Sequence, residues 1–169
     1  KYSEEEISRF AQETINKELA APLGTKRIGK HSIPTGIRYI EESLSLLRRL
    51  QQLGFEIWAV SGSNVWGVRA VFERLGIPRS RIIGIELQSA KGVFTPKVQT
   101  PVPVLEGKTT TLRRFIQQAP TIVVSDSIYD LPLFSYASHV RVLINSGMET
   151  SYTFFKEANV VRDQSWFVV

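Results

Sequence analysis

Two carboxylates four residues apart, Asp126 and Asp130, directly follow a short apolar segment at 121–124. A continuous apolar run is typical of a buried parallel strand, and Leu131-Pro132 indicates a helix that Asp130 can cap. Carboxylates just past the carboxyl end of such a strand lie where open α/β sheets bind ligands. Two of them suit a hard cation such as Mg²⁺. An Asp cap with an Asx turn explains the same pattern without a metal, so both interpretations stay open on this motif alone.

A second polar group follows another apolar segment, at 55–60, which predicts a strand. Ser61 begins the turn 61–64 after it, and a helix is expected to follow at 65–75. The Ser61 hydroxyl and the next backbone N–H groups can hold a phosphate at a helix N-terminus, although a plain N-cap is the simpler interpretation. These N–H groups belong to Gly62, Ser63 and Asn64.

Lys108 follows Gly107 at the start of a helix expected at 108–118. A lysine in that place is unfavourable for the helix dipole, which hints at a nearby anion. A solvated lysine is the alternative. If the strands are parallel, Ser61, Lys108 and the acid pair lie at one sheet edge. A hydroxyl, a cation and a metal-binding acid pair can together neutralise and orient a phosphoryl group.

The order of these groups resembles motifs two, three and four of the haloacid dehalogenase (HAD) superfamily, in its phosphoserine-phosphatase-like or phosphorylcholine-phosphatase-like branch. The resemblance extends over about 36–145. It implies that Ser61 hydrogen-bonds a phosphoryl oxygen and that Lys108 neutralises the nucleophile and the phosphate. It also implies that Asp126 ligates Mg²⁺, while Asp130 supports the metal shell or holds Lys108. The implied activity is Mg²⁺-dependent hydrolysis of a small phosphate monoester through an aspartyl-phosphate.

The first motif of that family, D-x-D after a strand, is missing from this sequence. Only three aspartates are present, Asp126, Asp130 and Asp163, and none belongs to a D-x-D. We therefore expect an upstream segment or a second chain to supply the nucleophile and a middle strand, and we expect residues 1–169 alone to be inactive. The alternative is a non-catalytic regulatory module, a pseudo-enzyme that keeps a phosphate or metal pocket.

Helix and strand patterns alternate along the chain, which predicts an α/β fold of Rossmann type, with a mainly parallel sheet and helices on both faces. By the same resemblance, residues 1–31 are expected to be part of a helical cap and residues 32–169 the core domain. The remaining expected elements are a helix from a capping box at 3–6 to before Pro22, a basic loop at 26–32, a helix from Thr35 to Gly54, a strand at 81–87, a hairpin or irregular excursion at 88–105, a strand at 121–125, a helix at 131–137, a strand at 140–144, a helix at about 149–158 and an apolar end at 166–169.

Composition narrows the other possibilities. The 169 residues contain 43% apolar residues, no cysteine and two histidines, which excludes thiolate chemistry and histidine metal clusters. The net charge of +5 comes from scattered basic residues without a nucleic-acid motif, and no apolar run approaches a membrane span. No nucleic-acid or membrane partner is therefore expected, and cytoplasmic and bacterial periplasmic locations are both compatible. A P-loop fails because Val102 stands where it needs Gly, and a hydrolase elbow fails at Ala59.

Overall fold

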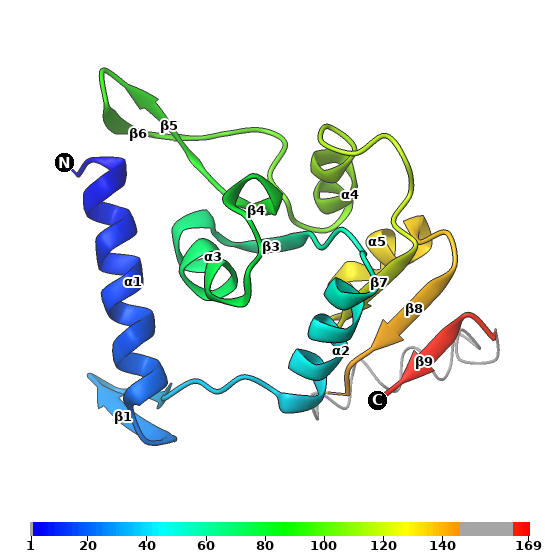
Figure 1. Ribbon diagram of the computed structural model, residues 1–169. Helices are drawn as coiled ribbons and strands as arrows, with labels where there is room; N and C mark the ends of the chain where they lie inside the picture. Colours follow the sequence, from blue (N-terminus) through cyan, green and yellow to red (C-terminus); the bar gives the residue numbers. More distant parts are fainter. Residues whose placement is uncertain (1, 146–163) are drawn as a thin grey trace. The chain divides into compact units, whose positions relative to one another are not determined.

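The computed structural model of the chain describes residues 2–145 and 164–169. Helices and strands alternate, and the α/β class expected from the sequence is confirmed (Figure 1). The chain forms two compact units. Unit 1 comprises Lys1–Ala59 and Ser63–Val98, and unit 2 comprises Val60–Gly62 and Gln99–Val169. Among the described helices, none is long and apolar enough to cross a membrane.

Unit 1 begins with helix α1 (Glu4–Ala20), whose predicted capping box is present. The Ser3 hydroxyl accepts from the Glu6 backbone N–H, and the Glu6 carboxylate accepts from the Ser3 backbone N–H. The expected basic loop at 26–32 is wrong, because this segment forms an antiparallel hairpin of β1 (Gly24–Ile28) and β2 (His31–Thr35). Its charged side chains are all exposed, so no alternation of apolar residues revealed the strands.

Helix α2 (Glu41–Gln52) begins later than expected. Thr35, where this helix was expected to begin, instead pairs with Gly24 in the hairpin, and no side chain caps α2. The following strand is also displaced along the chain. Strand β3 (Ala59–Asn64) includes the residues that were expected to form a turn, whereas the Phe55 segment lies before it.

The rest of unit 1 packs around the helix that follows β3. Helix α3 (Val65–Phe72) continues as a 3₁₀ turn (Glu73–Leu75), which ends at the left-handed Gly76 as predicted. Strand β4 (Ile82–Ile85) pairs with β3. The core between these elements consists of Ala59, Val68, Ile77 and Ile82. Helix α1 packs along α3 (Figure 1).

A glycine in β4 explains how closely the strand approaches α3. A Cβ at Gly84 would lie 2.7 Å from the Val65 Cα, so only glycine fits there. Beyond β4, β5 (Leu87–Ala90) and β6 (Val93–Val98) pair antiparallel with an irregular register, which confirms the expected hairpin (Figure 1). The single strand expected at 81–87 is thus divided between β4 and β5.

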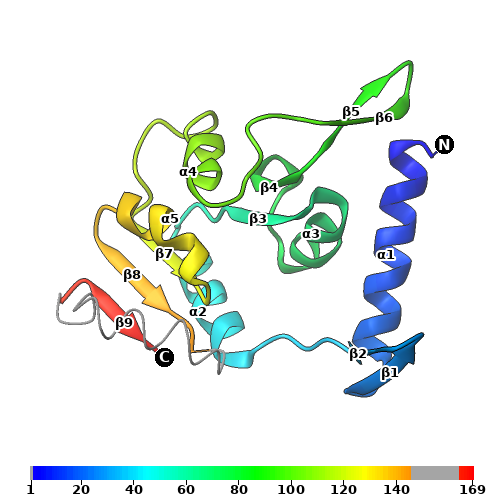
Figure 2. The same cartoon turned by 180° about the vertical axis from the view of Figure 1, so that it is seen from behind.

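Unit 2 contains a parallel three-stranded sheet in the order β7-β8-β9 (Figure 2). The expected strands at 121–125 and 140–144 are confirmed as β7 (Ile122–Ser125) and β8 (Val140–Leu143). The apolar C-terminal segment forms β9 (Trp166–Val168). The helix expected at 149–158 lies outside the described residues. In the described part of the chain, β3 and β7 belong to separate sheets, because β3 pairs with β4 and β7 pairs with β8.

The described α-helices of unit 2 are α4 (Glu106–Leu112) and α5 (Leu131–Tyr136). Helix α4 is shorter than the expected 108–118, and a 3₁₀ turn (Ile128–Asp130) leads into helix α5. Arg141 on β8 fastens the end of α5, because its guanidinium donates to the carbonyl oxygens of Phe134 at 2.9 Å and Ala137 at 2.7 Å. It also donates to the Ser165 hydroxyl just before β9. One side chain thereby connects two strands and a helix end.

Candidate functional site

The candidate site in unit 2 is centred on a buried ion pair. The Lys108 Nζ lies 2.5 Å from the Asp130 Oδ1, and the exposed fractions of the two side chains are 13% and 7%. The second oxygen of the same carboxylate, Oδ2, accepts a hydrogen bond of 2.6 Å from the Ser125 hydroxyl. The local sequence thus places a cation from α4 against an acid from the turn after β7.

Asp130 does not act as the helix cap that the sequence indicated. It occupies the N-cap position of α5, but its side chain makes no capping hydrogen bond. Both of its oxygens are already occupied by Lys108 and Ser125. Of the two roles that the family resemblance left open for Asp130, this geometry favours holding Lys108 over a place in a metal shell.

The turn between β7 and Asp130 is fixed by short-range hydrogen bonds. The Ser125 hydroxyl accepts from the Ser127 backbone N–H, and the Ser127 hydroxyl accepts from the Tyr129 backbone N–H. Ser125 was not among the site residues predicted from the sequence. The sequence feature that could have identified Ser125 is a small hydroxyl residue at the last position of a strand, directly before the acid pair.

Asp126 lies in the same turn, but its environment differs from that of Asp130. Its side chain is exposed. Its carboxylate makes no hydrogen bond or ion pair with the described residues, so its oxygens remain available to a cation. No group of three or more His, Cys, Asp or Glu side chains is found in the described part of the chain. Asp126 therefore fits Mg²⁺ as one ligand of a set that needs further oxygens.

Ser61 lies in the middle of β3 and belongs to unit 2 with Lys108 and the acid pair. It is not the cap of α3, because Asn64 holds that position and accepts from the Gly67 backbone N–H at 2.8 Å. Gly62 is also part of unit 2, whereas Ser63 and Asn64 are exposed residues of unit 1. The convergence of Ser61 and Asp126 at one sheet edge stays a prediction.

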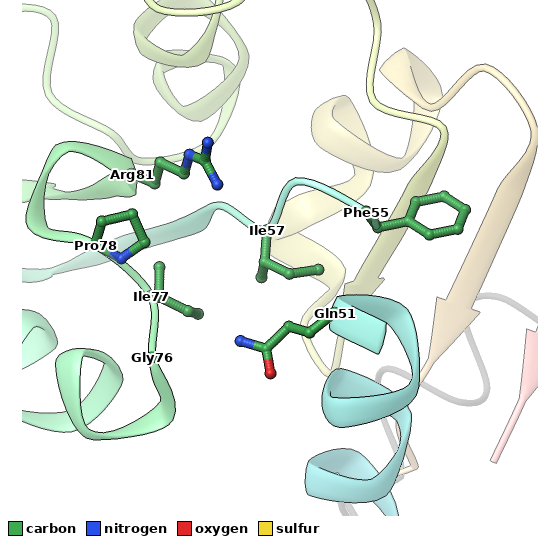
Figure 3. A pocket seen from close by; sticks show the side chains of 7 residues that line it. All are labelled: Gln51, Phe55, Ile57, Gly76, Ile77, Pro78 and Arg81. Carbon is green, nitrogen blue, oxygen red and sulfur yellow. The ribbon is translucent and has the colours of Figure 1, made fainter. Parts of the chain in front are cut away.

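A separate pocket of about 260 Å³ in unit 1 contains none of the predicted site residues. In Figure 3 the Gln51 side chain extends from α2 toward Ile57 and Ile77, and the Phe55 ring is turned away from them. Arg81 on its wall is paired with Glu56 at 3.4 Å. The lining is completed by Gly76, Ile77 and Pro78.

Comparison with known proteins places the chain in a family. The family model of haloacid dehalogenase-like hydrolases matches residues 2–135. No curated protein matches the chain.

Several solved structures share the fold. A conserved protein of unknown function from Anaerococcus prevotii aligns with a TM-score of 0.81 at 19% identity, over 98% of this chain and 50% of that one. A protein of unknown function from Bordetella pertussis aligns with a TM-score of 0.69 at 14% identity, over 99% and 67%. A phosphoserine phosphohydrolase-like protein from Francisella tularensis aligns with a TM-score of 0.54 at 19% identity, over 75% and 57%. The chain thus spans about half the length of the Anaerococcus protein.

Proposed function

Because the chain belongs to the haloacid dehalogenase-like hydrolase family, we propose that it carries the phosphate-binding and metal-binding part of a phosphatase acting on small phosphate monoesters. The observation that carries this proposal is the partly buried Lys108 ammonium group, which is held by Asp130, whose other carboxylate oxygen is held by Ser125. A partly buried lysine with one fixed partner retains N–H donors and a positive charge that can meet an anion.

Each predicted site residue has a role in this proposal. Lys108 offsets the charge of the phosphoryl group and of a carboxylate nucleophile, which otherwise repel each other. Asp130 fixes the direction of Lys108, and Ser125 fixes Asp130. The Ser61 hydroxyl donates a hydrogen bond to a phosphoryl oxygen. The backbone N–H groups of the next residues also contribute to binding the phosphate; these are Gly62, Ser63 and Asn64.

The nucleophile is the part that these residues do not supply, because none of the three aspartates belongs to a D-x-D. We propose that a D-x-D segment outside residues 1–169, upstream or on a second chain, supplies it. Its first carboxylate oxygen forms a bond to phosphorus while the ester P–O bond breaks, and the second carboxyl gives its proton to the departing alcohol. Water then attacks phosphorus and gives a proton to the second carboxylate; the bond between phosphorus and the first carboxylate breaks, so phosphate is released and both acids return to their starting states.

Asp126 is the proposed Mg²⁺ ligand of this chain, because its carboxylate is exposed and has no described partner. When bound, Mg²⁺ supplies positive charge against the phosphoryl oxygens. Asp126 provides one oxygen ligand and one negative charge in the turn directly after β7, the turn that also contains Asp130.

The phosphoserine-phosphatase-like branch is the proposed subgroup. The similarity to the Francisella phosphoserine phosphohydrolase-like protein supports it at the level of fold, and the β5-β6 hairpin ahead of the Gly107-Lys108 pair supports it at the level of element order.

A second function is favoured by one specific observation, the missing D-x-D. A protein that keeps Lys108 and Asp126 but has no carboxylate nucleophile would bind a phosphate group without hydrolysing a phosphate ester. Such a protein would be a phosphate-responsive or metal-responsive regulatory module.

Calorimetric titration of the natural protein with inorganic phosphate in the presence of Mg²⁺ tests the site. We expect Lys108→Met to weaken phosphate binding by about tenfold or more, since a charge-assisted hydrogen bond contributes about 1.5–3 kcal/mol. Lys26→Met is the matched control, because the Lys26 side chain is 52% exposed and lies in the β1-β2 hairpin. Equal phosphate affinities of the two variants would contradict the proposed site.

A further inference from the structure

The segment that leads into α4 is a tight turn between Val102 and Gly107. Within it, the backbone N–H of Val104 donates to the Val102 carbonyl, and that of Gly107 donates to the Val104 carbonyl, each at 2.8 Å. Leu105 lies inside this turn at φ 50° and ψ −128°, a backbone conformation that is unfavourable for a residue with a side chain. The backbone path into α4 is thus held in a strained and strongly hydrogen-bonded form.

Gly107 is required by this path. A Cβ at Gly107 would lie 1.9 Å from the Val102 carbonyl oxygen and 3.1 Å from its carbonyl carbon. The obstacle is backbone, which cannot rotate away as the end of a side chain can. Because Lys108 is the next residue, a shift of the Gly107 backbone that relieves the clash also moves the start of the Lys108 side chain.

The same turn lies against the strand that carries Ser61. A Cβ at Gly62 would lie 3.0 Å from the Val104 Cγ1 and 3.7 Å from the Pro103 carbonyl oxygen. Gly62 directly follows Ser61 on β3, and Pro103 is buried. The absence of a side chain at Gly62 therefore lets the turn sit directly against this strand.

We propose that Gly62 and Gly107 are positioning residues, which use the 102–107 turn to fix the Lys108 ammonium group relative to the Ser61 strand. This inference rests on the proposed function, because the Lys108 and Ser61 side chains are the phosphate contacts proposed there. The placement itself follows from the backbone clash at Gly107, the side-chain contact at Gly62 and the hydrogen bonds of the turn.

The two glycines should respond differently to a methyl group. At Gly107 the added carbon meets backbone, so the turn must open and the Lys108–Asp130 pair must loosen. At Gly62 it meets a Val104 methyl group at a tight but not impossible distance, so a small displacement of the turn is enough. Removing the Val104 methyl groups should abolish the effect at Gly62 and leave the effect at Gly107.

The first test is a ¹H–¹⁵N NMR measurement of hydrogen exchange at the Lys108 ammonium group, with Lys108→Arg used to assign the signal. In the natural protein we expect Gly107→Ala to accelerate this exchange by about tenfold, in proportion to the opening of the pair. Gly24→Ala is the control, because a Cβ there meets only the Thr35 Oγ1 at an ordinary 3.6 Å. An unchanged exchange rate in folded Gly107→Ala would overturn the proposal.

The second test is a rescue, and it decides the question if Gly107→Ala does not fold. We expect Gly62→Ala to shift the backbone amide resonances of Ser61 and Lys108, and Gly62→Ala/Val104→Ala to return them toward those of Val104→Ala alone. A Gly62→Ala variant that leaves the Lys108 resonance unchanged, or a double variant without recovery, would overturn the proposal.

Phosphate affinity separates this inference from the proposed function. If the protein binds inorganic phosphate, Gly107→Ala should weaken that binding by about tenfold, the scale of one charge-assisted hydrogen bond. If the protein binds no phosphate, the proposed function fails, while the two NMR tests still decide whether the turn positions Lys108.

Discussion

Lys108 and Asp130 form an ion pair of 2.5 Å between the first turn of α4 and the turn that follows β7, in which Asp130 is buried and Lys108 is partly buried. The Ser125 hydroxyl, at the end of β7, occupies the other oxygen of the same carboxylate. The pair therefore joins two segments of unit 2 that contain the proposed cation and the proposed metal ligand.

Asp130→Asn should lower the free energy of unfolding by about 3 kcal/mol, because it leaves the Lys108 charge buried without a counter-ion. Urea unfolding measures this. The control is Glu18→Gln, which removes the looser Lys26–Glu18 pair at 3.9 Å and should cost less than about 1 kcal/mol. Equal losses in the two variants would show that the Lys108–Asp130 pair does not stabilise unit 2.

Asp126→Asn should leave the stability nearly unchanged and weaken metal binding. Because this side chain is exposed, we expect a change in unfolding free energy within about 0.5 kcal/mol. Mg²⁺ affinity in the natural protein should fall by about tenfold or more, since a charge and a ligand oxygen are lost. Calorimetric titration with Mg²⁺ checks this, and unchanged affinity would remove Asp126 from the metal site.

The start of α1 should depend on pH. The Ser3 backbone N–H, which donates to Glu6, lowers the pKa of that carboxyl below its ordinary value of 4.5. A lowered folded-state pKa means that this capping contribution is fully present above about pH 4.5 and is lost as the pH falls through the lowered value. Amide exchange at the first turn of α1, expressed relative to the intrinsic rate at each pH, should therefore accelerate as the pH falls below this range.

Glu6→Gln is the control for this pH effect, because glutamine keeps a hydrogen-bond acceptor and has no proton to bind. Its amide exchange, corrected for intrinsic rates, should be the same on both sides of pH 4.5. A pH dependence that persists in Glu6→Gln would assign the effect to another group.

Arg141→Lys should destabilise unit 2 by about 2 kcal/mol. Lysine keeps the charge but cannot reproduce the guanidinium geometry that reaches Phe134, Ala137 and Ser165. Thermal unfolding of Arg141→Lys beside the exposed Arg27→Lys measures the difference. Similar melting temperatures would contradict the connecting role of Arg141.

The elements that bury apolar residues, such as β7, β8 and α5, were predicted from the sequence, because burial requires a regular spacing or a run of apolar residues. It did not predict the β1-β2 hairpin, whose residues are exposed and mostly polar. It also misplaced the start of β3, since Phe55 is apolar but lies before the strand and is 39% exposed.

For the site, residue types identified Lys108 and the acid pair, but only the structure separated the surroundings of the two acids. Asp126 and Asp130 look alike in the sequence, whereas one is exposed and the other is buried against Lys108 and Ser125. That distinction depends on a contact between distant segments of unit 2, which no local pattern encodes.

The proposed phosphatase is tested most directly by Mg²⁺-dependent hydrolysis of p-nitrophenyl phosphate, measured side by side for residues 1–169 and for a longer natural protein that carries D-x-D. We predict no hydrolysis above background by residues 1–169, and hydrolysis by the longer protein that is lost when the first Asp of D-x-D becomes Asn. Robust Mg²⁺-dependent hydrolysis by residues 1–169 alone would contradict the account, because its nucleophile would then lie among these residues.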